Sequence, residues 1–304
     1  MNLKEIYEIL TDINLEENDS FVELYLINKK NSEEYYSYKL TVEKKLQEEL
    51  IEIVSNSVFD VQNKNTCEYN PIGQIDSDIE KCSLDYIKNA NNVLASMVED
   101  SPNRLELLPE VKDIHSYCIK IKKGDLLIIT FRRFNKLRRL RAGFIGTVVE
   151  GRFKSLDGEL IGLYNDIDII IFNDDVFILN HIALERIFDI GIQFKEKAKE
   201  TLQDIKETDI IDNFDKFEED ALNNLNVIKR LTKIKENKTL PKVFDNFENV
   251  PKVIEHFGLN IELNQSKDKI IYVDKTQIED ITLLMNDSYY ETIIAGVPGI
   301  DKLK

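Results

Sequence analysis

The sequence predicts an α+β protein, in which an antiparallel β-meander is followed by helices and preceded by a smaller α/β N-terminal domain. Between residues 118 and 179, short apolar runs are separated by polar turns that leave no room for helical crossovers. After residue 182 the spacing of apolar residues becomes helical. An acidic, polar break at 98–103 separates these patterns from the first hundred residues. We therefore expect two domains, 1–103 and 104–304.

The first domain begins with a short amphipathic helix over 1–10. Alternating residues at 21–27 and 35–40 predict two strands joined by a polar turn. Helical spacing follows over 44–54, then a strand-rich stretch over 58–72 and a helix over 84–97.

The second domain opens with strands that alternate with turns. Apolar, β-branched runs predict strands at 118–121, 126–131, 144–149, 160–164, 167–172 and 176–179. Asp157 and Gly158 form a hairpin-turn signal, and a short basic helix is expected after Arg133, ending at Gly143. Helices are then expected from 182 to about 235, at 250–257 and at 275–285, with a strand at 270–273.

Charge is unevenly distributed along the chain. The net charge is −16, yet residues 119–154 hold eleven lysines and arginines and two acids, so this segment carries +9 and the remainder −25. Six of the nine arginines fall between Arg132 and Arg152. The planar guanidinium group suits phosphate. The nucleic-acid-binding residues predicted from this pattern are Arg132, Arg133, Lys136, Arg138, Arg139, Arg141, Arg152 and Lys154.

Three interpretations of the basic segment compete. It is a solvated face that balances acidic surroundings, a surface that binds the phosphate backbone of nucleic acid, or an amphipathic segment that lies on anionic lipid or on an acidic partner. The arginine density without matching acids favours nucleic acid.

The sequence shows no catalytic constellation, so we expect no enzyme activity. A metal-dependent nuclease that uses Asp166 and Asp168 is the alternative, because phosphodiester chemistry with metal ions requires converging carboxylates. Aspartate is, however, common in turns for its backbone hydrogen bonds alone. The three histidines are widely separated, and the three cysteines lack metal-ligand spacing. No glycine pattern indicates a nucleotide loop, so neither a cofactor nor a metal ion is expected.

No apolar stretch approaches the length of a membrane span, and the first residues lack the order of a secretory signal. These patterns predict a cytoplasmic protein.

Several segments resemble the KwaB subunits of the two-gene Kiwa anti-phage system. The likeness covers residues 119–304, and the order and spacing of its parts carry it. These parts are the basic strand and turn at 131–141, the strands at 166–171 and 176–180, the helix at 184–188, and the segment 283–289.

The resemblance implies a cytoplasmic, DNA-binding effector that assembles, as dimers, with KwaA, a membrane-embedded partner that would recruit it to the inner face of the cell membrane. The effector would block replication and expression of phage DNA. The first domain has no match in this resemblance, which leaves its role open between dimerisation and docking. A further alternative is a protein–protein adaptor that docks on a membrane partner, with its basic segment against acidic loops or anionic lipid.

Overall fold

The computed structural model describes residues 2–17, 19–74, 77–134, 146–149, 152–155 and 162–303. The chain forms two units, one of Met1–Glu68 with Ile75–Ile190 and one of Tyr69–Gln74 with Gly191–Lys304. This division differs from the expected boundary after residue 103. The reason is strand pairing: strand β1 (Ser20–Lys29) pairs along nearly its whole length with β5 (Ile114–Lys123), so residues on both sides of that boundary share one sheet.

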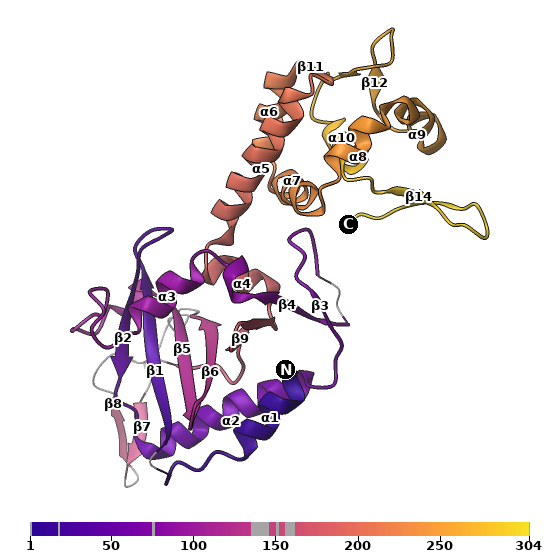
Figure 1. The fold of residues 1–304 in the computed structure, drawn as a ribbon. Coiled ribbons are helices and arrows are strands. Elements are labelled where there is room, and N and C mark those ends of the chain that lie inside the picture. The colour runs from indigo at the N-terminus through magenta and orange to yellow at the C-terminus, as the bar shows by residue number, and fades with distance from the viewer. Residues whose placement is uncertain are drawn as a thin grey trace. The chain divides into compact units, whose positions relative to one another are not determined.

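The first unit is built on a mostly antiparallel sheet. In the described part of the chain the sheet has eight strands in the order β2-β1-β5-β6-β9-β10-β4-β3 (Figure 1). Strands β5, β6, β9 and β10 are consecutive antiparallel neighbours, which confirms the predicted meander and the α+β class. A separate hairpin, β7–β8, lies between β6 and β9 in the chain. The remaining strand bounds are β2 (Tyr35–Leu40), β3 (Thr66–Glu68), β4 (Ile79–Ser83), β6 (Leu126–Arg133), β7 (Gly146–Val149), β8 (Arg152–Ser155), β9 (Ile169–Phe172) and β10 (Asp175–Ile178).

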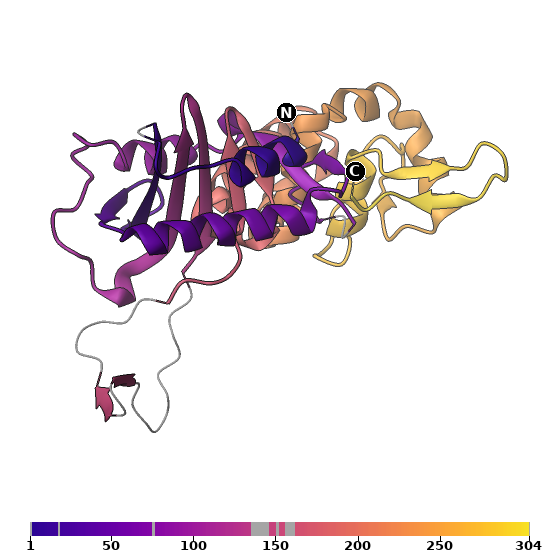
Figure 2. The ribbon, with the colours of Figure 1, turned by 90° about the horizontal axis from the view of Figure 1, so that it is seen from below.

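Both faces of this sheet are covered by helices. On one face lie α1 (Leu3–Thr11) and α2 (Lys44–Val61), which Figure 2 shows running across the strands. Alternate strand residues such as Leu24 and Ile119 pack into this core with Val54 of α2. The intervening residues face α3 (Ala90–Ser96) and α4 (His181–Ile187), where the rings of Phe131 and Phe188 meet edge to face with centroids 5.3 Å apart. Burial on both faces explains why β9 reads as a continuous apolar run.

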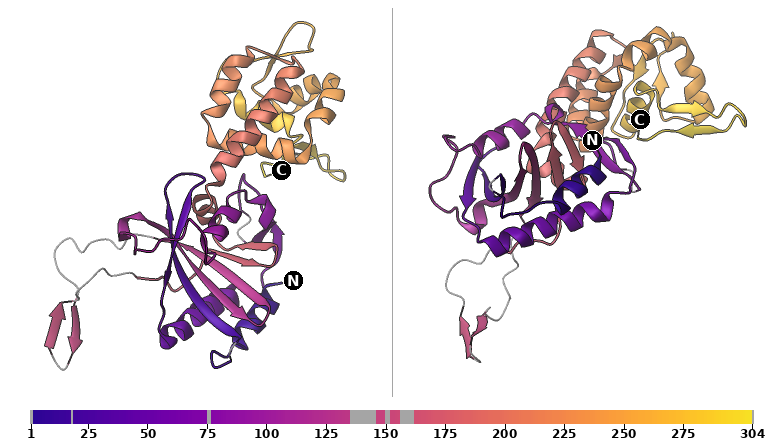
Figure 3. Two further views of the ribbon diagram at one scale, coloured as in Figure 1. Left: turned by 60° about the vertical axis from the view of Figure 1, so that its left-hand side comes forward. Right: turned by 60° about the horizontal axis from the view of Figure 1, so that its bottom comes forward.

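The second unit is mainly helical. Its described core holds Phe194, Leu202, Phe217 and Leu231, whose side chains are fully buried. The C-terminal hairpin β14–β15 extends away from the helices of this unit (Figure 3). Its elements are α5 (Ile190–Glu207), β11 (Ile211–Asp212), α6 (Phe214–Leu222), α7 (Leu225–Asn237), α8 (Leu240–Asp245), η3 (Phe247–Asn249), α9 (Val250–Phe257), β12 (Glu262–Leu263), β13 (Ile270–Ile271), α10 (Ile278–Met285), β14 (Tyr289–Glu291) and β15 (Pro298–Ile300).

Several element boundaries differ from the sequence expectations. Helix α2 continues to Val61, because Val58 lies on the same buried face as Val54, and only the short β3 remains of the expected strand-rich stretch. The expected helix over 84–97 is split into the short helix η1 (Leu84–Tyr86) and α3. Residues 162–164 are not a strand, and the expected basic helix after Arg133 and the turn at Asp157 lie outside the described residues. A further short helix, η2 (Val111–Asp113), precedes β5.

No helix in the described part of the chain combines the length and the apolar character that crossing a membrane demands.

Candidate nucleic-acid interface

Arg132 at the end of β6 is bound by two carboxylates of its own chain. Its guanidinium group donates to Asp168, whose side chain is 1% exposed, and lies 3.1 Å from an oxygen of Asp166. It also lies over the ring of Tyr164, 5.0 Å from the centroid. The Arg132 side chain is only 12% exposed. These contacts give Arg132 a structural role and remove it from the surface that could bind phosphate.

Asp168 organises the end of the sheet where β6 and β9 meet. Besides Arg132, its carboxylate accepts from the backbone N–H of Arg133 at 2.7 Å and from Asn180 Nδ2 at 3.0 Å. Its own N–H donates to the Phe131 carbonyl. Burial raises the pKa of the Asp168 carboxyl, and the hydrogen bond from Arg133 and the charge of Arg132 oppose that rise. The carboxylate is therefore saturated with donors from the protein itself.

Arg133 differs from its neighbour in that no carboxylate pairs with its side chain among the described residues. Strand alternation places adjacent side chains on opposite faces, so only Arg132 can reach Asp166 and Asp168 with its guanidinium group. Burial and the nearby Arg186 guanidinium lower the pKa of Arg133, while Asp168 raises it.

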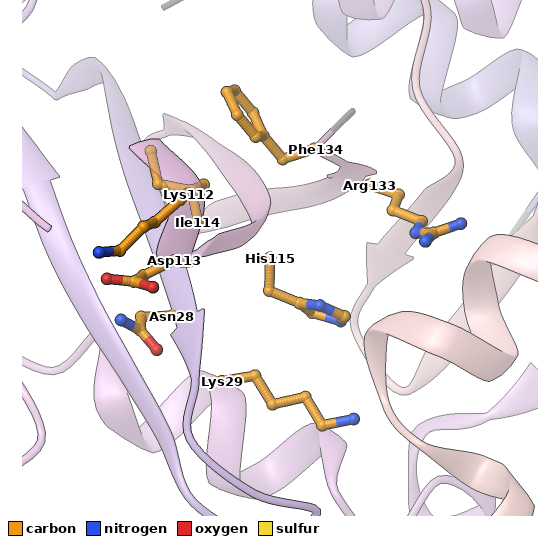
Figure 4. Close-up of a pocket in the computed structure, with 8 residues that line it drawn as sticks. All are labelled: Asn28, Lys29, Lys112, Asp113, Ile114, His115, Arg133 and Phe134. Carbon is orange, nitrogen blue, oxygen red and sulfur yellow. The ribbon is translucent and has the colours of Figure 1, made fainter. Parts of the chain in front are cut away.

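Arg133 lines a pocket of about 330 Å³, drawn in Figure 4. The pocket is formed by the end of β1, the short helix η2, the start of β5 and the end of β6, and its lining is largely polar. Its residues are Asn28, Lys29, Lys112, Asp113, Ile114, His115, Arg133 and Phe134.

The other predicted binding residues are less fully described. Arg152 and Lys154 lie on β8, which pairs with β7 in register Val149↔Arg152 and Thr147↔Lys154. Lys136, Arg138, Arg139 and Arg141 lie outside the described residues. Their role in nucleic-acid binding stays a prediction from the sequence.

The aspartates of the nuclease alternative are engaged in the fold. Asp166 and Asp168 both bind Arg132, and Asp175 pairs with Lys81 at 2.8 Å. No group of three or more metal-ligating side chains converges in the ranges that the structure describes. The arrangement of Asp166 and Asp168 thus explains both residues without a metal ion, and the absence of enzyme activity stays a prediction.

Sequence reasoning missed Lys29, His115 and Arg186, which surround Arg133. His115 is isolated from the other histidines in the sequence, yet its Nε2 lies 2.9 Å from the Arg186 carbonyl oxygen. These residues are far apart in the chain, and strand pairing brings them together: Asn28 of β1 faces Ile114 of β5, and Ser116 faces Arg133 of β6. Only the polar residues at the strand ends could have signalled the site.

Comparison with known proteins gives one family match. A family model described as Kiwa protein KwaB-like matches residues 111–295, which is more than half of the chain and includes Arg133, His115 and Arg186. No curated protein and no solved structure matches.

Proposed function

Because the chain belongs to the KwaB-like family and is thus a Kiwa anti-phage defence subunit, we propose that it acts by binding DNA through its basic segment and so blocks phage DNA replication and expression. The observation that carries the DNA proposal is the +9 charge of residues 119–154 within a chain of net charge −16. Each phosphate that these cations neutralise releases counterions from the nucleic acid.

The acidic remainder of the chain supports selective binding. A strongly negative body repels other polyanions at a distance, while a local cationic segment attracts a phosphate backbone that comes within about one Debye length, roughly 8 Å at physiological salt. Assembly of two copies would place two such segments on one DNA molecule. We therefore propose a homodimer, recruited to the inner face of the cell membrane by a KwaA-like membrane protein.

The binding residues are tested by replacing Arg138 and Arg139 with alanine together. We expect DNA affinity to fall about tenfold or more and the slope of log affinity against log salt to become shallower by about 2, because two phosphate contacts are lost. Fluorescence anisotropy with a labelled duplex over a range of NaCl concentrations measures both quantities.

The matched control is Lys4→Ala/Lys45→Ala, which removes the same charge from exposed positions of α1 and α2 that have no ion pair among the described residues. This variant should bind as the unaltered protein does. Equal losses in both double variants would show that only net charge matters, and an unchanged Arg138/Arg139 variant would contradict the proposal.

Incubation with plasmid DNA and Mg²⁺ or Mn²⁺ separates binding from cutting. We expect retarded but intact DNA. Metal-dependent cutting that Asp166→Ala abolishes would instead favour the nuclease. Flotation of the protein alone with anionic liposomes, without DNA retardation, would favour an adaptor that docks on a membrane or a partner.

A further inference from the structure

Four basic residues meet at one end of the first unit, where β1, β5 and β6 approach α4. They are Lys29, His115, Arg133 and Arg186, hereafter the basic cluster. Figure 4 shows the side chains of Lys29, His115 and Arg133 extending to the same side of the pocket, with the imidazole between the other two. Lys112 and Asp113 lie on the other side of the pocket. From this arrangement we infer that the basic cluster binds a phosphate group of a nucleic-acid strand, a role that rests on the proposed DNA binding and specifies one of its contacts.

Among the described residues, no carboxylate pairs with the two guanidinium groups of the cluster. Lys29 pairs with Asp189 at 2.9 Å, so that lysine is neutralised. Arg133 and Arg186 have no carboxylate partner in the described part of the chain, although they are close enough for Arg186 to lower the pKa of Arg133. Two like charges held together are unfavourable unless an anion lies between or beside them. Phosphate suits this role, because each guanidinium group can donate two parallel hydrogen bonds to its oxygens.

Of the acids near the cluster, Asp113 lies on the opposite side of the pocket from Arg133, and Asp189 is paired with Lys29. Asp168 approaches Arg133, but its oxygens accept from Arg132, Asn180 and the Arg133 backbone. Lys112 pairs with Glu110 at 2.7 Å and so adds no free charge to the pocket. An incoming anion would therefore meet Arg133 and Arg186 without displacing a carboxylate from either.

His115 adds a pH-dependent donor to the cluster. Its Nε2–H donates to the carbonyl of Arg186 in the last turn of α4, a carbonyl that the helix itself leaves unpaired. The neutral ring then has Nδ1 unprotonated. Burial and the charges of Lys29 and Arg133 lower the pKa of His115, whereas the bond to Arg186 and the charge of Asp189 raise it. A bound phosphate would favour the protonated ring, so binding should take up a proton and strengthen as the pH falls toward the pKa of His115.

Nuclear magnetic resonance of the histidine ring protons tests whether a phosphate bound at the basic cluster raises the pKa of His115. The chain has only three histidines, so their signals are few. An unphosphorylated trinucleotide supplies internal phosphodiesters, and a 5′-phosphorylated dinucleotide also supplies a terminal phosphate. We expect the apparent pKa of His115 to rise by about one unit when a ligand binds, since an opposite charge within hydrogen-bonding distance favours the imidazolium. A rise with both ligands identifies an internal phosphate, and a rise with the phosphorylated ligand alone identifies a terminal one. No rise with either ligand overturns the inference.

Arg186→Gln is the informative variant, because Arg186 is exposed and its replacement should leave the fold intact. We expect it to weaken oligonucleotide binding about tenfold and to abolish the shift of His115, as one charge-assisted contact is lost. Lys112→Gln is the matched control, since it removes a cation of the pocket that is already paired with Glu110, and it should change neither quantity. Equal effects of the two variants would overturn the assignment.

The two proposals fail separately. One outcome is that long DNA binds with an affinity that depends on Arg138 and Arg139 while neither short ligand changes the pKa of His115. In that case the basic cluster is not a phosphate site and the DNA proposal stands. If His115 responds to the short ligands but the protein does not retard long DNA, the phosphate site stands and the DNA proposal fails.

Discussion

Replacing Asp168 with alanine is expected to lower the free energy of unfolding by about 3–5 kcal/mol, the range typical of breaking a buried ion pair by removing one partner. The variant leaves the largely buried Arg132 guanidinium without its main counterion and leaves the Arg133 N–H and Asn180 amide without their acceptor. Urea unfolding monitored by circular dichroism measures the loss.

Asp166→Ala is the matched control for this prediction. Its carboxylate also pairs with Arg132 but its side chain is 60% exposed, so its removal should cost less than about 1 kcal/mol. A pair of catalytic aspartates would behave differently, because both variants would lose DNA cutting while retaining stability. Equal stability of the two variants would contradict the structural role of Asp168.

The second large effect concerns the stability of the protein at alkaline pH. His181, at the start of α4, lies between Glu80 of β4 and Glu185 of its own helix, at 2.7 and 3.1 Å. Burial alone would lower the pKa of His181, but hydrogen bonds to Glu185 and Glu80 and their charges raise it to about 9. Because the folded pKa exceeds the ordinary value of 6.5, this stabilisation is complete below pH 6.5 and is lost as the pH rises to 9.

Between pH 6 and pH 9.5 we expect the free energy of unfolding to lose the contribution of His181, about 3 kcal/mol, which follows from the difference between its folded and ordinary pKa values. It is measured as the difference in unfolding free energy between the unaltered protein and His181→Gln at each pH, which cancels the titration of other groups. His256→Gln is the matched control, because it removes a histidine at a half-exposed position and leaves the contacts of His181 in place. A difference that stays constant over this range would contradict the assignment.

The sequence allowed most local structure to be predicted. The helix over 250–257 is found with the same bounds, since Pro251 near its start and Gly258 at its end are local signals. The strands of the meander could be predicted equally well, because β-branched runs such as 169–172 alternate with turn residues. The extent of α2 could not be predicted, because burial of Val58 against other elements decides where that helix ends.

The candidate site could be predicted only in part. The charge of the basic segment is visible in composition, whereas the sequence cannot say which arginine is free. Arg132 and Arg133 are adjacent residues of the same type, yet Arg132 is neutralised by Asp168 and Arg133 lines a pocket. The sequence gives no sign that His115 and Arg186 are neighbours, because seventy-one positions separate the two residues.

By itself, then, the sequence determined the type of most helices and strands and where the charge accumulates, because apolar period, turn chemistry and charge are properties of neighbouring residues. Tertiary structure alone decided that the first hundred residues complete the sheet of the meander, and which cations are neutralised. Strand pairing and ion pairing join residues that are distant in the chain, and their energies depend on burial and on distances of a few ångströms that exist only once the chain has folded.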